Sequence, residues 1–285
     1  MPSFLFFVRR PLSPATACRR GRRGLCREHA GARPVTQRSE PIFNVPPVVL
    51  ATIAVLVLVH AVRMLAMTDA EDLQFLLAFA FIPARYDIHP IVGDAFPGGF
   101  GADIWTFFTY AFIHVDLLHI GVNLAWLLPF GTALARRFGA WRYVLFMLVA
   151  AAAGAFAHLV SHPGAMVPMI GASAAISGAM AAAMRFVFQH GGPLGVWRGE
   201  PDAYRVPAAP LSATLRDPRF LIFLGAWIGM NALFGLGTVS IGGEGQEIAW
   251  QAHIGGFFAG LFLFTAFDPV VSRGASASTQ PGDPS

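Results

Sequence analysis

The sequence predicts an all-α polytopic membrane protein whose core is a bundle of six transmembrane helices. Of its 285 residues, 55% are hydrophobic and only 13% are charged, and the mean hydropathy is +0.57. This composition is typical of membrane proteins. Six apolar stretches of about 18–22 residues occur along the chain, and each is long enough to cross about 30 Å of hydrocarbon. These stretches cover approximately residues 48–67, 114–135, 141–160, 170–189, 219–239 and 250–267.

The distribution of arginine orients these spans. Nine arginines precede residue 39, and others lie between the second and third spans and between the fourth and fifth. The segment between the first two spans carries several acidic residues but only one basic residue, Arg85, and the connection before the sixth span carries Glu244 and Glu247. Because basic loops remain in the cytoplasm, both termini are predicted to be cytoplasmic.

Both ends of the chain differ in composition from the membrane domain, which is predicted over residues 43–268. Residues 1–42 are rich in arginine, serine and proline, and we expect a disordered basic tail that contacts anionic lipid head groups. A mitochondrial presequence is the alternative for this segment. Cys18 and Cys26 lie in it, on the reducing side, so no disulfide is expected. Residues 269–285, rich in serine, glycine and proline, predict a disordered C-terminal tail.

The acidic connection over residues 69–113 contains one short apolar run, residues 73–82. This run is too short to cross a bilayer. We therefore expect it to lie at the interface or to pack against the bundle.

The second span begins with polar side chains that could serve chemistry. His119 and Asn123 are four residues apart, so they share one face of a helix at its outer end. Two side-chain donors at that depth could stabilise a negatively charged oxygen, or they could form a polar contact between helices. His114 need not share this face, and we expect a structural role for it.

The fourth span opens with a candidate nucleophile, Ser173, within the stretch Gly171–Gly178. Such small residues also suit close helix packing. The apolar segment that precedes this span is flanked by Pro163 and Pro168. These prolines disfavour a helix in the segment. Non-helical backbone at membrane depth survives where protein buries it or a wet cavity adjoins it, so Ser173 is expected in a first helical turn at the floor of a cavity. The unpaired N–H groups of that turn are donors for an oxyanion. Ser177, one turn deeper, is the rival nucleophile.

The sixth span supplies a candidate general base, His253, predicted at the same depth as Ser173. Gly256 and Gly260 form a small-xxx-small pair that permits the close approach a Ser–His hydrogen bond needs. The spans contain no carboxylate at this depth, since Asp116 lies near the surface, so the arrangement predicts a dyad. No His-Glu-x-x-His motif is present to favour a metal site.

Taken together, these motifs resemble the rhomboid family of intramembrane serine proteases. The resemblance rests on their order and matched depth over about residues 43–268. It is carried by His119-x-x-x-Asn123, Gly171-Ala172-Ser173, Ala252-His253-x-Gly255-Gly256, the six-span core with both ends inside, and Trp105–Tyr110 before the second span. Two departures are Ala174, where the family often has glycine, and Ser177, where an aromatic residue often supports the histidine ring.

The resemblance implies that Ser173 is the nucleophile and His253 the general base and then general acid. It implies an oxyanion hole formed by His119, Asn123 and the Ser173 backbone N–H, and no cofactor. Substrates would be single-span membrane proteins cut near the outer end of their helix, and no nucleic-acid partner is expected. The absence of a seventh span favours the bacterial inner membrane over the mitochondrial one.

Two other classes are consistent with parts of the pattern. A catalytically dead member of the same fold would bind membrane proteins, although such members usually lack the serine or the histidine. A transporter would show repeats and broken helices in paired positions, which the sequence lacks.

Overall fold

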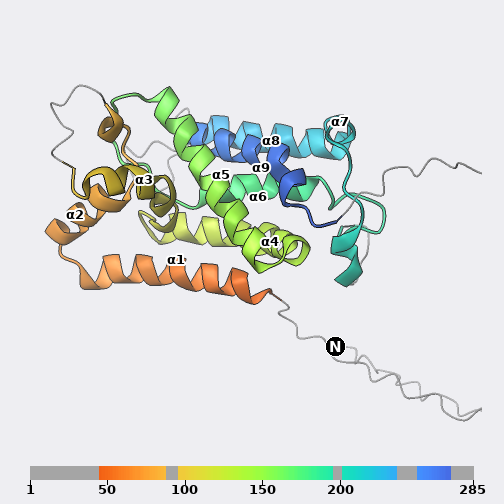
Figure 1. Cartoon of the computed structure of the whole chain (residues 1–285), viewed down its shortest axis with the longest axis horizontal. Coiled ribbons are helices and arrows are strands. Elements are labelled where there is room, and N and C mark those ends of the chain that lie inside the picture. The colour runs from red at the N-terminus through yellow and green to blue at the C-terminus, as the bar shows by residue number, and fades with distance from the viewer. Residues whose placement is uncertain (1–44, 88–95, 195–200, 236–248, 271–285) are drawn as a thin grey trace, which may run out of the picture. The chain divides into compact units, whose positions relative to one another are not determined.

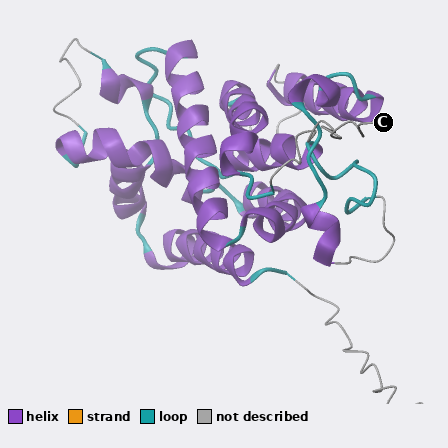
Figure 2. Ribbon diagram, turned by 45° about the vertical axis from the view of Figure 1, so that its right-hand side comes forward, coloured by secondary structure: helices purple, strands orange, loops and turns teal. Residues whose placement is uncertain are grey.

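The computed structural model describes residues 45–87, 96–194, 201–235 and 249–270 (Figure 1). Within these ranges the chain is helical, and its one strand-like feature is an isolated bridge between Phe81 and Met169 (Figure 2). The predicted N-terminal tail, with Cys18 and Cys26, and all but the first two residues of the predicted C-terminal tail lie outside the described residues.

The predicted all-α membrane fold is confirmed. Its α-helices are α1 (Pro47–Ala66), α2 (Asp69–Phe79), α3 (Gly99–Thr109), α4 (Leu117–Phe138), α5 (Ala140–Ser161), α6 (Ser173–Met184), α7 (Leu211–Thr214), α8 (Pro218–Gly235) and α9 (Trp250–Phe267). Short 3₁₀ turns lie at Pro83–Tyr86, Tyr110–Phe112 and Pro201–Arg205.

Among the described residues, four helices are long and apolar enough to cross a membrane: α1, α4, α5 and α9. The fourth predicted span, 170–189, is shorter than expected, because α6 covers only Ser173–Met184. Phe186 and Val187 are buried like the helix, but they lie in turns. Hydropathy follows burial rather than helical geometry, so it overestimated the length of this helix.

Helix α6 lies among α4, α5 and α9 (Figure 1). Every residue of α6 except Ser173 is buried. A helix that is apolar and buried on all sides is a core helix, and its small side chains let its neighbours approach closely. A Cβ added to Gly260 of α9 would overlap the carbonyl group of Gly178, which shows that the two backbones touch.

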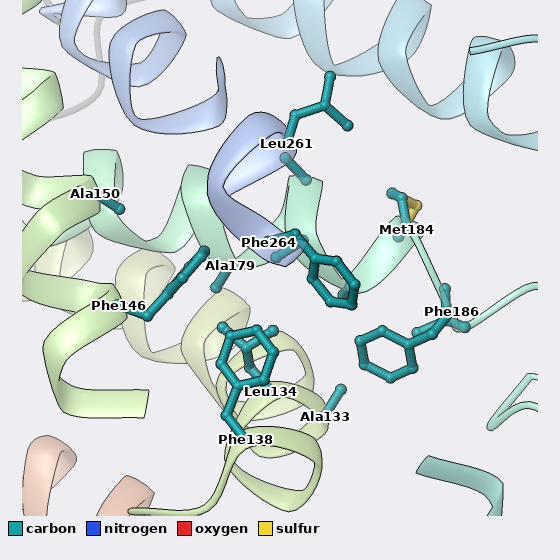
Figure 3. Close-up of a cluster of buried hydrophobic side chains, with 14 of the residues drawn as sticks. Ala133, Leu134, Phe138, Phe146, Ala150, Ala179, Met184, Phe186, Leu261 and Phe264 are labelled. Atoms are coloured by element: carbon teal, nitrogen blue, oxygen red, sulfur yellow. The ribbon is translucent and has the colours of Figure 1, made fainter. Parts of the chain in front are cut away.

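Aromatic side chains fill the end of the bundle farthest along α6 from Ser173. Phe138, Phe146, Phe186 and Phe264 pack there around Leu134, as Figure 3 shows. At the same end, Arg137 pairs with Asp268 through two hydrogen bonds of 2.9 and 2.8 Å. It also donates to the carbonyl groups of Tyr204 and Val206. Arg137 thus joins α4, the chain after α9 and the connection between α6 and α7.

The predicted short apolar run at 73–82 is largely the helix α2. A capping box between Thr68 and Glu71 starts this helix. Asp72 then pairs with the buried Arg63 of α1 at 2.7 Å. Hydrogen bonds from Trp105 to Ala78 O and from Thr109 to Phe79 O hold α3 against the end of α2. The run therefore packs against protein, one of the two placements expected.

Candidate active site

Ser173 is the first residue of α6, and a non-helical segment, residues 162–172, leads to it. Reciprocal hydrogen bonds between Phe81 and Met169 hold this segment in place, and the Gly171 N–H donates to Tyr110 O at 3.0 Å. Met169 is buried, while its neighbours line a cavity. This agrees with the expectation that the apolar segment flanked by Pro163 and Pro168 is not helical and leads to Ser173 beside a cavity.

The first turn of α6 keeps its hydrogen-bond donors available. The N-cap residue is Ala172, which makes no side-chain capping bond. The first N–H groups of a helix have no acceptor within the helix and suit an anionic oxygen. Backbone donors therefore lie beside the Ser173 hydroxyl.

His253 lies in the first turn of α9, and its Nε2 is 2.7 Å from Ser173 Oγ. Gly256, on the same helix, lies against the backbone of Ala174, where an added Cβ would overlap the carbonyl group. This backbone contact brings α9 close enough to α6 for a hydrogen bond between a short serine and an imidazole. The structure thus brings together the two side chains that the sequence paired.

The second nitrogen of His253 has a partner that the sequence analysis missed. His253 Nδ1 is 2.6 Å from Oδ1 of Asn231, a buried residue of α8. One signal could have identified it: an amide inside an apolar span is a functional candidate by default.

His119 of α4 lines the same cavity as Ser173. Asp116 accepts the His119 backbone N–H at 2.7 Å and caps α4, so this carboxylate serves the helix start. The His119 ring lies against Gly171: a Cβ there would be 2.8 Å from His119 Nε2. Gly171 also has φ +119°, a conformation that residues with a side chain rarely adopt. Glycine at this position therefore allows His119 to approach the start of α6.

Asn123 lies one turn further along α4 and is buried. Its Nδ2 donates to His119 O at 2.9 Å, and its Oδ1 has no hydrogen-bond partner within the described residues. Because an amide nitrogen carries two hydrogens, one remains for another acceptor. Asn123 and His119 both line the cavity that contains Ser173.

His114 contributes to the scaffold around the cavity. It is fully buried, and its Nε2 is 3.5 Å from the backbone N–H of Ala172. Its own carbonyl accepts from Arg63 at 2.8 Å. These contacts fit the structural role expected for it.

Ser177, the rival nucleophile, lies one turn deeper in α6 and is buried. The imidazole of His253 is bonded to Ser173 instead. The geometry therefore favours Ser173 over Ser177.

A cavity of about 770 Å³ joins these residues. Its apolar wall includes Val122, Trp126, Ile176, Met180 and Trp227. Its polar lining includes His119, Asn123, Asn231 and His253 together with Ser173. A mostly apolar wall with a few polar groups is expected for a site that binds an apolar ligand and fixes its orientation. In the part of the chain that the structure describes, no group of three or more His, Cys, Asp or Glu residues could hold a metal ion.

Comparison with known proteins gives one family match. A family model described as Rhomboid domain matches residues 101–268. The matched region is more than half of the chain and contains α4 to α9 with every residue of the candidate site. No curated protein matches the chain.

Proposed function

Because the chain belongs to the rhomboid family of intramembrane serine proteases, we propose that it cleaves membrane-protein substrates through a Ser173–His253 dyad. The observation that supports this proposal best is the 2.7 Å separation between Ser173 Oγ and His253 Nε2. The two residues are 80 positions apart in the sequence and belong to different helices, α6 and α9. A serine and a base within hydrogen-bonding distance constitute the minimal activated nucleophile.

In the proposed reaction, His253 Nε2 takes the hydroxyl proton as Ser173 Oγ attacks the carbonyl carbon of the scissile peptide. The tetrahedral intermediate collapses when the imidazolium returns this proton to the leaving amine, which breaks the C–N bond and leaves an acyl-enzyme. Water then attacks the ester carbonyl, with His253 again acting as base. Release of the new carboxyl end restores the Ser173 hydroxyl, and no cofactor is required.

The negative oxygen of both intermediates needs donors that are already oriented. We assign this role to Asn123, His119 and the Ser173 backbone N–H. Asn123 and His119 line the cavity from α4, while the N–H lies at the uncapped start of α6. Donors that are fixed in place before the reaction stabilise the developing charge without reorganisation.

Replacing Asn123 by alanine is expected to lower kcat by about 10²- to 10³-fold with little change in KM, because this donor acts on the intermediate rather than on the bound substrate. The measurement is the rate of cleavage of a single-span reporter protein in proteoliposomes. Unchanged kcat in a folded Asn123→Ala variant would remove Asn123 from the proposed oxyanion hole.

The substrates we propose are single-span membrane proteins cut near the outer end of their helix. The chain is itself an integral membrane protein, as its family and its apolar helices show. The arginine distribution supports cytoplasmic termini, and we place the protein in a bacterial inner membrane, with the mitochondrial inner membrane as the alternative.

Labelling with a fluorophosphonate probe tests the proposed dyad. The wild-type protein, purified in detergent, is expected to be labelled, and so is Ser177→Ala. Ser173→Ala is expected to lose the label, and His253→Ala to lose most of it, because the hydroxyl then has no base. Labelling that survives in Ser173→Ala would exclude Ser173 as nucleophile. A folded wild-type protein that takes up no probe and cleaves no reporter would indicate a catalytically dead member of the fold.

A further inference from the structure

A catalytic histidine needs a partner on the nitrogen that faces away from the serine. In the Ser–His–Asp arrangement, a carboxylate holds this nitrogen and fixes the tautomer. None of the helices α4, α5, α6, α8 and α9 contains an aspartate or a glutamate. Ser177, one turn after Ser173, has no ring on which the imidazole could stack. Within the part of the chain that the structure describes, these helices therefore need another group to orient His253.

Asn231 lies in the required position, and its amide can be oriented from its contacts. Its Nδ2 is 2.8 Å from the carbonyl oxygen of Trp227, one turn earlier in α8. A carbonyl oxygen only accepts hydrogen bonds, so the NH₂ group must face Trp227. The amide oxygen Oδ1 then faces His253 Nδ1 at 2.6 Å.

This orientation determines the tautomer of His253. An amide oxygen cannot donate a hydrogen bond, so the hydrogen of the neutral imidazole must lie on Nδ1. Nε2 then carries the lone pair and points at the Ser173 hydroxyl 2.7 Å away. A general base needs this tautomer. Because Asn231 is only 8% exposed, water competes little for either bond.

Asn231 belongs to a different helix from both members of the dyad. The indole of Trp227 stacks on Phe257 of α9, with ring centroids 4.4 Å apart, and this contact docks α8 beside the site. The same residue supplies the carbonyl that orients the amide. The orientation of His253 therefore depends on the docking of α8 against α9.

We infer that Asn231 is the positioning residue of the site: it holds the Nδ1–H tautomer of His253 and stabilises the imidazolium that forms during attack. This inference rests on the proposed protease function. Ser173 of α6, His253 of α9 and Asn231 of α8 then form a triad in which a neutral amide takes the position of the usual carboxylate.

The test compares variants of Asn231 for cleavage of a single-span reporter in proteoliposomes, with kcat and KM determined separately. Asn231→Leu has nearly the same size but accepts no hydrogen bond. We expect it to lower kcat by about 10- to 150-fold, the range for loss of a hydrogen bond to a charged group, with KM within about twofold. Asn231→Asp keeps an acceptor oxygen and is expected to retain at least about ten times the kcat of Asn231→Leu. Ile228→Ala, at an exposed position of the same helix, serves as the control and is expected to match wild type.

The outcomes separate this inference from the proposed function. A wild-type protein without cleavage or fluorophosphonate labelling defeats both. An active wild type with a folded Asn231→Leu variant of unchanged kcat overturns only the role of Asn231. A rise in KM with kcat unchanged also overturns it, because Asn231 would then act as part of the cavity wall. If Asn231→Leu does not fold, Asn231→Ala, which removes the amide without adding bulk, takes its place in the same comparison.

Discussion

Replacing Ser173 by alanine is expected to lower reporter cleavage by about 10⁴- to 10⁶-fold, effectively to background. The change removes the one oxygen that lies 2.7 Å from His253 Nε2, and with it the acyl-enzyme route. Ser177 is not expected to substitute, because it lies a full turn deeper in α6 and is buried. The measurement is product formation from a single-span reporter in proteoliposomes, followed by mass spectrometry of the two fragments.

The variant should keep its fold, since Ser173 is the one residue of α6 that is not buried. Its thermal unfolding in detergent is therefore expected to match wild type. The matched control is Ser161→Ala. This exposed hydroxyl bonds to two carbonyl groups of its own helix and to the ring of His162, not to Ser173 or His253, and its loss should leave cleavage unchanged. Cleavage by a folded Ser173→Ala protein within tenfold of wild type would contradict the proposed mechanism.

Replacing Gly260 by alanine is expected to destabilise the protein by about 3 kcal/mol or more. The added methyl would overlap the backbone carbonyl of Gly178, and a backbone group cannot move aside by changing rotamer. Helix α9 would have to move away from α6, which also lengthens the hydrogen bond between His253 and Ser173. We expect a lower midpoint of thermal unfolding in detergent and a loss of fluorophosphonate labelling, both measured on one preparation.

Gly225→Ala in α8 is the matched control, because a Cβ there would meet no atom within 4 Å. Alanine also favours a helix over glycine, so this variant is expected to be at least as stable as wild type. A Gly260→Ala protein as stable and as readily labelled as Gly225→Ala would show that α6 and α9 do not pack as closely as the structure has them.

Helix existence and placement could be predicted well because lipid imposes a strong constraint. Backbone groups inside a bilayer must be paired within the segment, so a long apolar stretch becomes a helix. The predicted first and last spans, 48–67 and 250–267, correspond to α1 (Pro47–Ala66) and α9 (Trp250–Phe267). The fourth span was wrong in length because burial by protein also permits apolar turns, as at Phe186 and Val187.

The candidate site was predictable where the local sequence carries its own signal. A hydroxyl after a proline-flanked approach identified Ser173, and a histidine beside two glycines identified His253. Asn231 carries only the general signal of an amide inside an apolar span. Its role at His253 depends on Trp227 and Phe257, which dock α8 on α9. Sequence spacing gives no information on which face of α8 meets the imidazole.

The sequence by itself determined the class of protein, the positions of the apolar helices and the serine, histidine and asparagine that the family resemblance requires. These follow from hydropathy, proline and glycine, whose effects act over a few residues. Only the tertiary structure decided that α6 is short and buried and that Asn231 binds the second nitrogen of the His253 imidazole. These features depend on how the helices pack against one another. Side-chain packing sets the distances between helices, and the sequence of a single segment does not encode them.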